Sequence, residues 1–126
     1  MAAPVNLLEL SHGFIVSHCI SIAAQLKLHL VISRPMTCEE IAQETKTHAP
    51  TLKHLLDVLL AYEILVKDDS DKYLPAPSLN QLELVLSLYN GHVAFQVWEH
   101  ALHSVRTGEP AWDKKFGKNF NKNASN

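Results

Sequence analysis

The apolar residues between Leu7 and about Leu30 constrain the fold of this chain more than any other feature. They recur at steps of three and four residues, which is the spacing of one broad buried helix face. The residues in this spacing are Leu7, Leu10, Phe14, Ile15, Cys19, Ile22, Ala23, Leu26 and Leu30. Ile20, Ala24, Leu28 and Val31 widen the stripe further. We therefore predict a long helix, broken near Leu28, whose apolar surface one covering layer can hardly hide.

Two further helices are predicted after the break at Ser33–Pro35. Thr37, followed three residues later by Glu40, forms the pattern of a capping box and predicts a short helix of about two turns. Pro50 suits the first turn of the next helix. The apolar stripe of that helix consists of Leu52, Leu55, Leu56, Leu59 and Leu60. A short turn joins the two helices, as in a helix-turn-helix.

The segment ILVKDDSDKYLPAP follows these helices and predicts a β-hairpin. A short apolar run meets a polar turn at residues 68–71, and Tyr73 and Leu74 come next, before prolines close the segment. Three helices followed by a hairpin are the order of a winged helix-turn-helix. The expected fold class is therefore mainly α, a winged helix-turn-helix with a short β-hairpin as its wing.

Beyond Pro77, apolar residues continue a helical rhythm toward Arg106–Gly108. The Asn90–Gly91 pair marks a break between two helices. Residues 118–126 are rich in asparagine and lack an apolar period, so they are expected to fray. At 126 residues the chain is long enough for one domain and too short for two. We expect one winged-helix domain over residues 1–117 and a tail over 118–126.

Charge, cysteine spacing and the N-terminal sequence indicate which partners and which cellular compartment to expect. The net charge is −2 with histidine neutral, and neither half carries a long run of one sign, so no broad attraction to nucleic acid or to an acidic membrane is expected. Cys19 and Cys38 lack CxxC spacing and are interpreted as buried or half-buried thiols. The N-terminus has no basic residue before its first apolar stretch, and polar residues interrupt 14–32. These features favour a cytoplasmic protein without a membrane-spanning helix.

Four segments give the chain its resemblance to a known family. They are GFIVSHCISIAAQLKLHLVI, MTCEEIAQETKTHAPTLKHLLDVLLAYEILVK, DKYLPAP and WEHALHSVRTGEPAWDKKFG. Together they resemble the N-terminal dimerisation domain of S-adenosylmethionine-dependent small-molecule O-methyltransferases, the group of the hydroxyindole, plant phenolic and bacterial tailoring enzymes. The chain departs from the family pattern at Glu63, where a glycine is usual, and at His54 and Asp57, where arginines are usual.

The resemblance implies helices that interlock with a second subunit, so the expected partner is a second copy or a full-length O-methyltransferase. In the family, a Rossmann-like domain that follows this one binds S-adenosylmethionine and carries the catalytic histidine. The glycines here are isolated, at positions 13, 91, 108 and 117, so no cofactor site and no catalytic residue is expected in this chain. By resemblance, Phe14, Ile15 and His18 reach toward the partner's substrate pocket.

Histidines and cysteines that could bind a metal or act as nucleophiles are interpreted here as structural residues. His100 and His103 form a close helical pair beside Glu99, but no third metal ligand is visible, so no metal site is expected. They are interpreted as exposed positions of a helix whose apolar side carries Trp98, Leu102 and Val105. Cys38, at a helix start, is interpreted as structural rather than nucleophilic.

Two alternative functions remain open. The first is a DNA-binding winged-helix regulator with a recognition helix over 51–62, although Lys53 is the only cation there and the wing carries three aspartates. The second is a protein that binds a small hydrophobic ligand in a cavity near Trp98. Phe14, Phe95 and Trp98 either line such a cavity or, as is commoner for aromatics at helical spacing, belong to the core.

The main prediction is association with another subunit. Apolar residues on several helices add surface that a chain of 126 residues can hardly cover by itself. These residues are Ile15, Ile20, Ala24, Leu28, Val85, Leu88 and Phe95. We therefore expect a dimer in which the first helix and the helices after Pro77 bury this surface against the partner, and we expect no methyl transfer by the chain alone.

Overall fold

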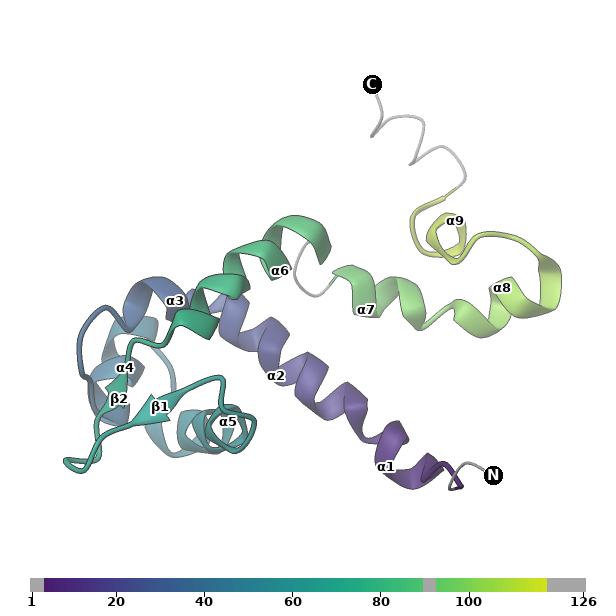
Figure 1. Cartoon of the computed structure of the whole chain (residues 1–126). Helices are drawn as coiled ribbons and strands as arrows, with labels where there is room; N and C mark the ends of the chain where they lie inside the picture. Colours follow the sequence, from purple (N-terminus) through teal and green to yellow (C-terminus); the bar gives the residue numbers. More distant parts are fainter. Residues whose placement is uncertain (1–3, 90–92, 118–126) are drawn as a thin grey trace. The chain divides into compact units, whose positions relative to one another are not determined.

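The computed structural model describes residues 4–89 and 93–117 and is mainly helical (Figure 1). The chain divides into two compact units, with the boundary between Gly91 and His92. The first unit contains α1–α6 and both strands, and the second contains α7–α9. The expected tail, residues 118–126, lies outside the described residues, and the extent of the domain, 1–117, stays a prediction.

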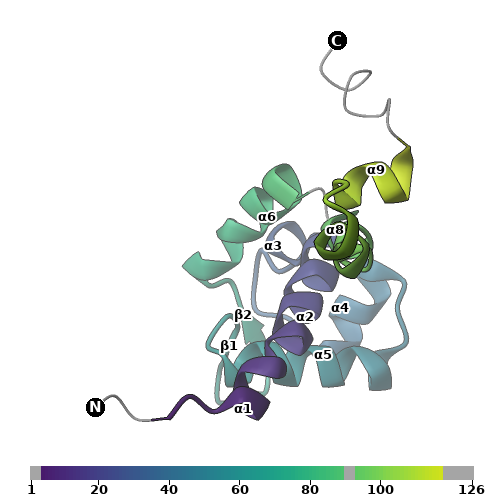
Figure 2. The same ribbon diagram turned by 90° about the vertical axis from the view of Figure 1, so that its right-hand side faces the viewer.

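The long N-terminal helix is present but divided into α1 (Leu7–Ser11), α2 (Gly13–Gln25) and α3 (Leu28–Val31). The break near Leu28 is confirmed, because Lys27 has a left-handed backbone with φ 57°. The division at His12 was not predicted. Within the first unit, α2 runs from α1 to α3 beside α6, and the turned view shows it crossing in front of α5 (Figures 1 and 2).

The predicted buried face of this segment is wrong in most of its members. Leu7, Leu10, Phe14 and Ile22 are exposed, whereas Ala23 is buried as predicted. Ala24 and Leu28, which we expected to need a partner, are buried within the chain itself because the core-facing side of α2 meets α5 and α6. The apolar residues are thus divided between an internal core and an external surface.

The helix-turn-helix is formed by α4 (Cys38–Thr45) and α5 (Ala49–Ala61), as predicted. The capping box is confirmed: the Glu40 amide donates to the Thr37 hydroxyl at 3.2 Å, and the Thr37 amide donates to the Glu40 carboxylate at 3.1 Å. Pro50 lies in the first turn of α5. Leu52, Leu56 and Leu59 are buried in the core.

The wing is an antiparallel pair of short strands, β1 (Val66–Lys67) and β2 (Tyr73–Leu74), so the predicted hairpin is confirmed. An additional bridge joins Met36 to Tyr73, with backbone hydrogen bonds of 2.7 and 2.9 Å. This bridge attaches the wing to the residue preceding the α4 cap. Because the hairpin itself is only two residues long on each side, the bridge and the buried Tyr73 ring hold it on the core.

A 3₁₀ helix, η1 (Pro77–Gln81), leads into α6 (Leu82–Tyr89). Leu79 and Leu82 are buried at this junction. They belong to a single hydrophobic core to which α2–α5 and the wing also contribute. The largest fully buried side chains in this core are Tyr73, Leu28, Ile32, Met36, Ile41, Leu56, Leu59, Leu65 and Leu79.

The second unit contains α7 (Val93–Trp98), α8 (Ala101–Thr107) and α9 (Ala111–Phe116). The predicted helix end near Arg106–Gly108 is confirmed, because Gly108 ends α8 with φ 76°. The division between α7 and α8 and the existence of α9 were not predicted. The predicted break at Asn90–Gly91 falls on residues outside the described ones, although α6 ends and α7 begins on either side of it.

Candidate subunit interface

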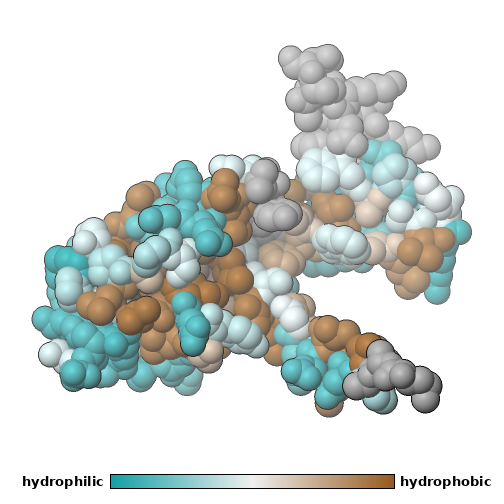
Figure 3. All heavy atoms as spheres, in the orientation of Figure 1, coloured by the Kyte–Doolittle hydropathy of each residue, from teal (hydrophilic) through white to brown (hydrophobic). Residues whose placement is uncertain are grey.

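An exposed apolar surface follows α1 and α2, and we call it the α1–α2 apolar surface. Its residues are Leu7, Leu8, Leu10, Phe14, Ile15 and Ile22. Leu7 is 76% exposed and Ile22 is 45% exposed. Helix α1 contains no buried residue among its five, and Figure 3 shows apolar atoms at the outer end of the first unit, where it lies. A helix of five residues is not stable in water by itself, and in the described structure α1 is supported by its contacts with α2 while its leucines stay exposed.

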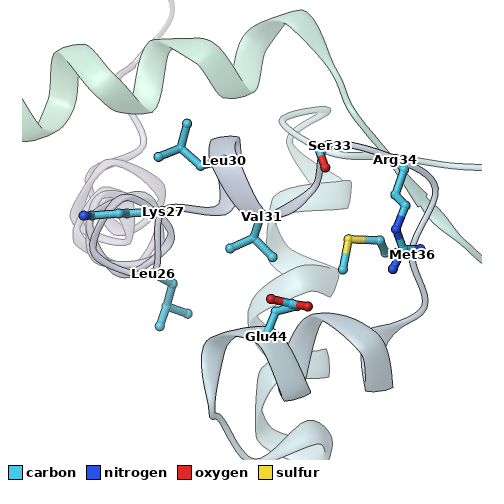
Figure 4. Close-up of a pocket in the computed structure, with 8 residues that line it drawn as sticks. All are labelled: Leu26, Lys27, Leu30, Val31, Ser33, Arg34, Met36 and Glu44. Atoms are coloured by element: carbon cyan, nitrogen blue, oxygen red, sulfur yellow. The ribbon is translucent and has the colours of Figure 1, made fainter.

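A hollow of about 400 Å³ lies at the other end of this segment (Figure 4). Leu26, Leu30 and Val31 border it from α2 and α3, and the Glu44 carboxylate faces it from α4. Leu30 is itself exposed. Lys27, Ser33 and Arg34 also line the hollow, so it is of mixed character, and Leu30 is the exposed apolar residue at this end of the segment.

The N-terminal segment also meets a simple criterion for crossing a membrane. Leu7–Gln25 is long enough and apolar enough to cross a membrane, and only 17% of its most apolar stretch is buried. Core helices of soluble proteins and signal sequences meet the same criterion, so it does not distinguish a lipid from a protein partner. The expectation that the chain has no membrane-spanning helix stays a prediction.

Three predicted substrate-pocket residues, Phe14, Ile15 and His18, lie together on the exposed part of α2. The rings of Phe14 and His18 contact edge to face, with centroids 6.2 Å apart. All three residues are exposed, so the interpretation of Phe14 as a core residue is wrong for this chain by itself. The structure thus leaves them accessible to another molecule, while their role in a substrate pocket stays a prediction.

The other two candidates, Phe95 and Trp98, belong to α7 in the second unit. Phe95 is half-buried, whereas Trp98 is 74% exposed and borders a hollow of about 380 Å³. That hollow is lined by Val97, Trp98, Ala101, Ser104, Val105 and Ala111. The interpretation of Trp98 as a core residue is therefore wrong here. Its neighbours Leu102 and Val105 are also exposed, whereas His100 and His103 are half-buried, which reverses the predicted orientation of α8.

Two lysines, Lys53 of α5 and Lys67 of the wing, are paired with carboxylates. Lys53 Nζ lies 3.2 Å from Asp57 Oδ1, and Lys67 Nζ lies 2.6 Å from Asp71 Oδ1. These contacts raise the pKa of both lysines and lower the pKa of Asp71. Lys67 also lies over the Tyr73 ring, 5.1 Å from its centroid. The charges of these two lysines, which a winged helix could use on DNA phosphates, are thus neutralised locally.

Neither thiol is activated. Cys38 is buried and Cys19 is half-buried, as predicted, and both are free. Burial raises the pKa of each thiol, and the nearby Glu39 raises that of Cys38 further. Because the thiolate is the nucleophile, these environments favour the unreactive form at neutral pH.

Two histidines, His29 and His103, make hydrogen-bond contacts with glutamates. His29, whose side chain is 4% exposed, places Nε2 2.7 Å from Glu83 and joins α3 to α6. His103 lies 3.2 Å from Glu109. Among residues 4–89 and 93–117, no three His, Cys, Asp or Glu side chains lie close enough to share a metal ion. Sequence reasoning missed the His29–Glu83 contact, because the two residues lie 54 positions apart.

Sequence reasoning also missed one residue of the apolar surface, Leu8. Its exposure of 69% follows from the isolation of α1, whereas the helical periodicity counted only Leu7 and Leu10 at this end. The signal that could have found it is the sequence LLEL itself, in which three leucines surround one charge and cannot all face one internal core.

Comparison with known proteins identifies a family and several similar enzymes. A family model, the O-methyltransferase dimerisation domain, matches residues 8–79. Phenazine O-methyltransferase PhzM of Lysobacter antibioticus is 27% identical over 94% of this chain and 38% of its own length. O-demethylpuromycin-O-methyltransferase of Streptomyces alboniger is 29% identical over 94% of this chain and 34% of its own length.

Solved structures show the same fold. The pyocyanin biosynthetic protein PhzM superposes with a TM-score of 0.83 at 25% identity, over 95% of this chain and 38% of that one. Human N-acetylserotonin methyltransferase, solved with S-adenosylmethionine, has a TM-score of 0.71 at 18% identity, over 94% of this chain and 40% of that one, and shows the fold alone.

The chain thus spans between about a third and two fifths of the length of the relatives it matches. The family match contains α2–α5 and the wing, together with most of α1. These are the elements that build the helix-turn-helix core and carry the α1–α2 apolar surface. The chain belongs to the O-methyltransferase dimerisation domain family.

Proposed function

We propose that this chain acts as a subunit-pairing domain that forms a homodimer through the α1–α2 apolar surface. The observation that carries the proposal is the exposure of Leu7, Leu8, Leu10, Phe14, Ile15 and Ile22 on two consecutive helices of a dimerisation domain. Burying such a surface against a second copy removes apolar area from water, which is the main favourable contribution to protein association.

The same surface also suits a full-length O-methyltransferase subunit as an alternative partner. The support is that the curated relatives extend over a much longer chain than this one. In that assembly Phe14, Ile15 and His18 approach the partner's substrate pocket, and Phe95 and Trp98 are the other candidates for contact with substrate. A thermal-shift series with phenolic ligands tests this role, since Phe14→Ala should abolish any ligand-induced rise in melting temperature.

We further propose that the chain alone neither binds S-adenosylmethionine nor transfers a methyl group. The isolated glycines support this, because they offer no Gly-rich loop for a nucleotide. Calorimetric titration with S-adenosylmethionine should give no binding heat. Methylation of a phenol or a hydroxyindole by the purified chain would contradict the proposal.

Nucleic acid and membrane are not the proposed partners, and the proposed compartment is the cytoplasm. Local pairing of Lys53 and Lys67 argues against phosphate binding. Polar residues Ser17, His18 and Gln25 on α2 disfavour burial in hydrocarbon. The free thiols of Cys19 and Cys38 are typical of a reducing compartment.

One pair of matched variants tests the pairing surface directly. Ile22→Glu places a charge on the α1–α2 apolar surface and should convert the dimer to a monomer, because the carboxylate would be buried without a partner. Val66→Glu is the control, since Val66 on the wing is 47% exposed, close to the 45% of Ile22. Light scattering measures both masses. An Ile22→Glu variant that stays dimeric would contradict the proposed surface.

A further inference from the structure

We propose that α2 pairs antiparallel with α2 of a second copy along one seam, with Cys19 beside the two-fold axis. The seam consists of Leu8, His12, Ile15, Cys19, Ile22 and Leu26. The inference rests on the proposed self-association and adds the contacting residues and the direction of the two helices.

The spacing of the seam is that of a helix-pairing face. Its members alternate steps of four and three residues, which is the a/d repeat of paired helices. On a helix of 3.6 residues per turn, the exposed seam residues Ile15 and Ile22 point away from the buried Ala24, whereas Cys19 and Leu26 are half-buried at the edge of the core. Helix α2 is therefore apolar on two opposite faces, and its own chain fully buries only one of them.

Charge selects a second copy as the occupant of the seam and sets its direction. Glu9 and Lys27 are the only Asp, Glu, Lys or Arg residues between positions 1 and 33, and each lies nine residues from His18. Neither makes an ion pair with another side chain in the described parts of the chain. In an antiparallel pair centred near Cys19, Glu9 of each copy meets Lys27 of the other. A parallel pair would instead place like charges together.

The same register matches apolar side chains. With Glu9 set against Lys27, the two-fold axis lies beside His18 and Cys19, so Ile15 of one copy lies next to Ile22 of the other and the two Cys19 side chains are neighbours. The leucines of α1 then reach the end of the seam where Leu26 and Leu30 border the hollow of Figure 4. Filling this hollow gives the five-residue α1 the covering layer that its own chain lacks.

Thiol cross-linking tests the position of Cys19. Cys38→Ala leaves Cys19 as the only thiol, and light scattering first establishes that this variant is a dimer. A short bifunctional maleimide at pH 8.5 should then give a covalent dimer on a denaturing gel, and Cys19→Ser should abolish it. Cross-linking at this position requires the two Cα atoms to lie near each other, as paired seam positions do.

Two further experiments test the direction of the helices. In a Cys19→Ser, Cys38→Ala background, Leu8→Cys combined with Leu30→Cys should cross-link between copies, whereas either substitution alone should not. Glu9→Lys should weaken dimerisation about ten-fold, since each dimer contains two such contacts. Adding Lys27→Glu to Glu9→Lys should restore the wild-type affinity.

The outcomes separate this inference from the proposed function. A monomer at all concentrations would overturn both. A dimer whose Cys19 does not cross-link would overturn the seam and leave self-association intact. Cross-linking by the single Leu8→Cys variant, or a double charge exchange that does not restore affinity, would overturn the antiparallel direction.

Discussion

At the scale of single residues, Glu63 has a backbone conformation that its side chain disfavours. It follows α5 with φ 59°, in the left-handed region, at the position where the family usually has glycine. An L-residue with a Cβ atom costs about 1–2 kcal/mol there, whereas glycine adopts the conformation freely. The departure noted in the sequence thus falls on a position that requires a positive φ.

Replacing Glu63 by glycine should therefore stabilise the protein. Glycine also loses more backbone entropy on folding, so Glu63→Gly should raise the free energy of unfolding by a net of about 0.5–1 kcal/mol. Urea denaturation followed by circular dichroism measures this. The control is Ala61→Gly in the last turn of α5, which should lose up to about 1 kcal/mol. A destabilised Glu63→Gly variant would contradict the explanation.

The capping box of α4 predicts how the stability of the protein depends on pH. Hydrogen bonds from the Thr37 backbone and from Arg34 lower the pKa of Glu40 below its ordinary 4.5. A lowered pKa in the folded state adds stability above pH 4.5 that is lost as pH falls through the folded pKa. The stability curves of wild type and Glu40→Gln should therefore differ at neutral pH and converge in acid. A difference that stays constant between pH 7 and pH 3 would contradict this linkage.

At the scale of elements, we propose that the helix-turn-helix and the wing serve as a scaffold and do not bind DNA. Lys53 and Lys67 are each held by an aspartate on their own element. Binding to a duplex would have to break these contacts before either lysine could neutralise a phosphate. The fold class alone would have suggested the opposite function.

We therefore expect no binding of random-sequence duplex DNA at about 0.15 M salt, measured by fluorescence anisotropy. At low salt, any weak binding should be strengthened by Asp57→Asn, which releases Lys53, and strengthened further when Asp57→Asn and Asp71→Asn are combined, because Lys67 is then released as well. Tight binding at physiological salt that is lost in Lys53→Gln would favour the regulator instead.

The elements could be predicted where a local signal specifies them. Thr37 with Glu40 and the leucines of 52–60 specify α4 and α5, and the polar turn at 68–71 specifies the wing. Which apolar face of α2 turns inward could not be predicted, because both faces have helical spacing and only the packing of α5 and α6 decides. Helix α9 was not predicted because its six residues are too few to show a helical periodicity. The Met36–Tyr73 bridge was not predicted because the two residues lie far apart in the sequence.

The candidate site was only partly predictable for the same reason. The excess of apolar residues in 7–30 indicated an interface, and the exposure of Phe14 and Ile15 agrees with it. Ala24 and Leu28 were assigned to that interface wrongly, since their burial depends on tertiary contacts that no local pattern contains. The burial of His29 by its contact with Glu83 is another such long-range feature.

At the scale of the whole molecule, the chain is a dimerisation domain with a complete core and an uncovered N-terminal surface. The core of the first unit explains why the domain can fold, and the proposed partner accounts for the exposure of the α1–α2 apolar surface. The second unit adds the exposed Trp98, Leu102 and Val105, which a larger assembly could cover.

The central claim, that this chain pairs with a second copy, is tested most directly by its solution mass. Light scattering on the purified chain across a dilution series should give twice the chain mass of 14.1 kDa at micromolar concentrations and should fall toward that mass only on dilution. A mass of one chain at every concentration, from a sample whose circular dichroism shows it folded, would contradict the account.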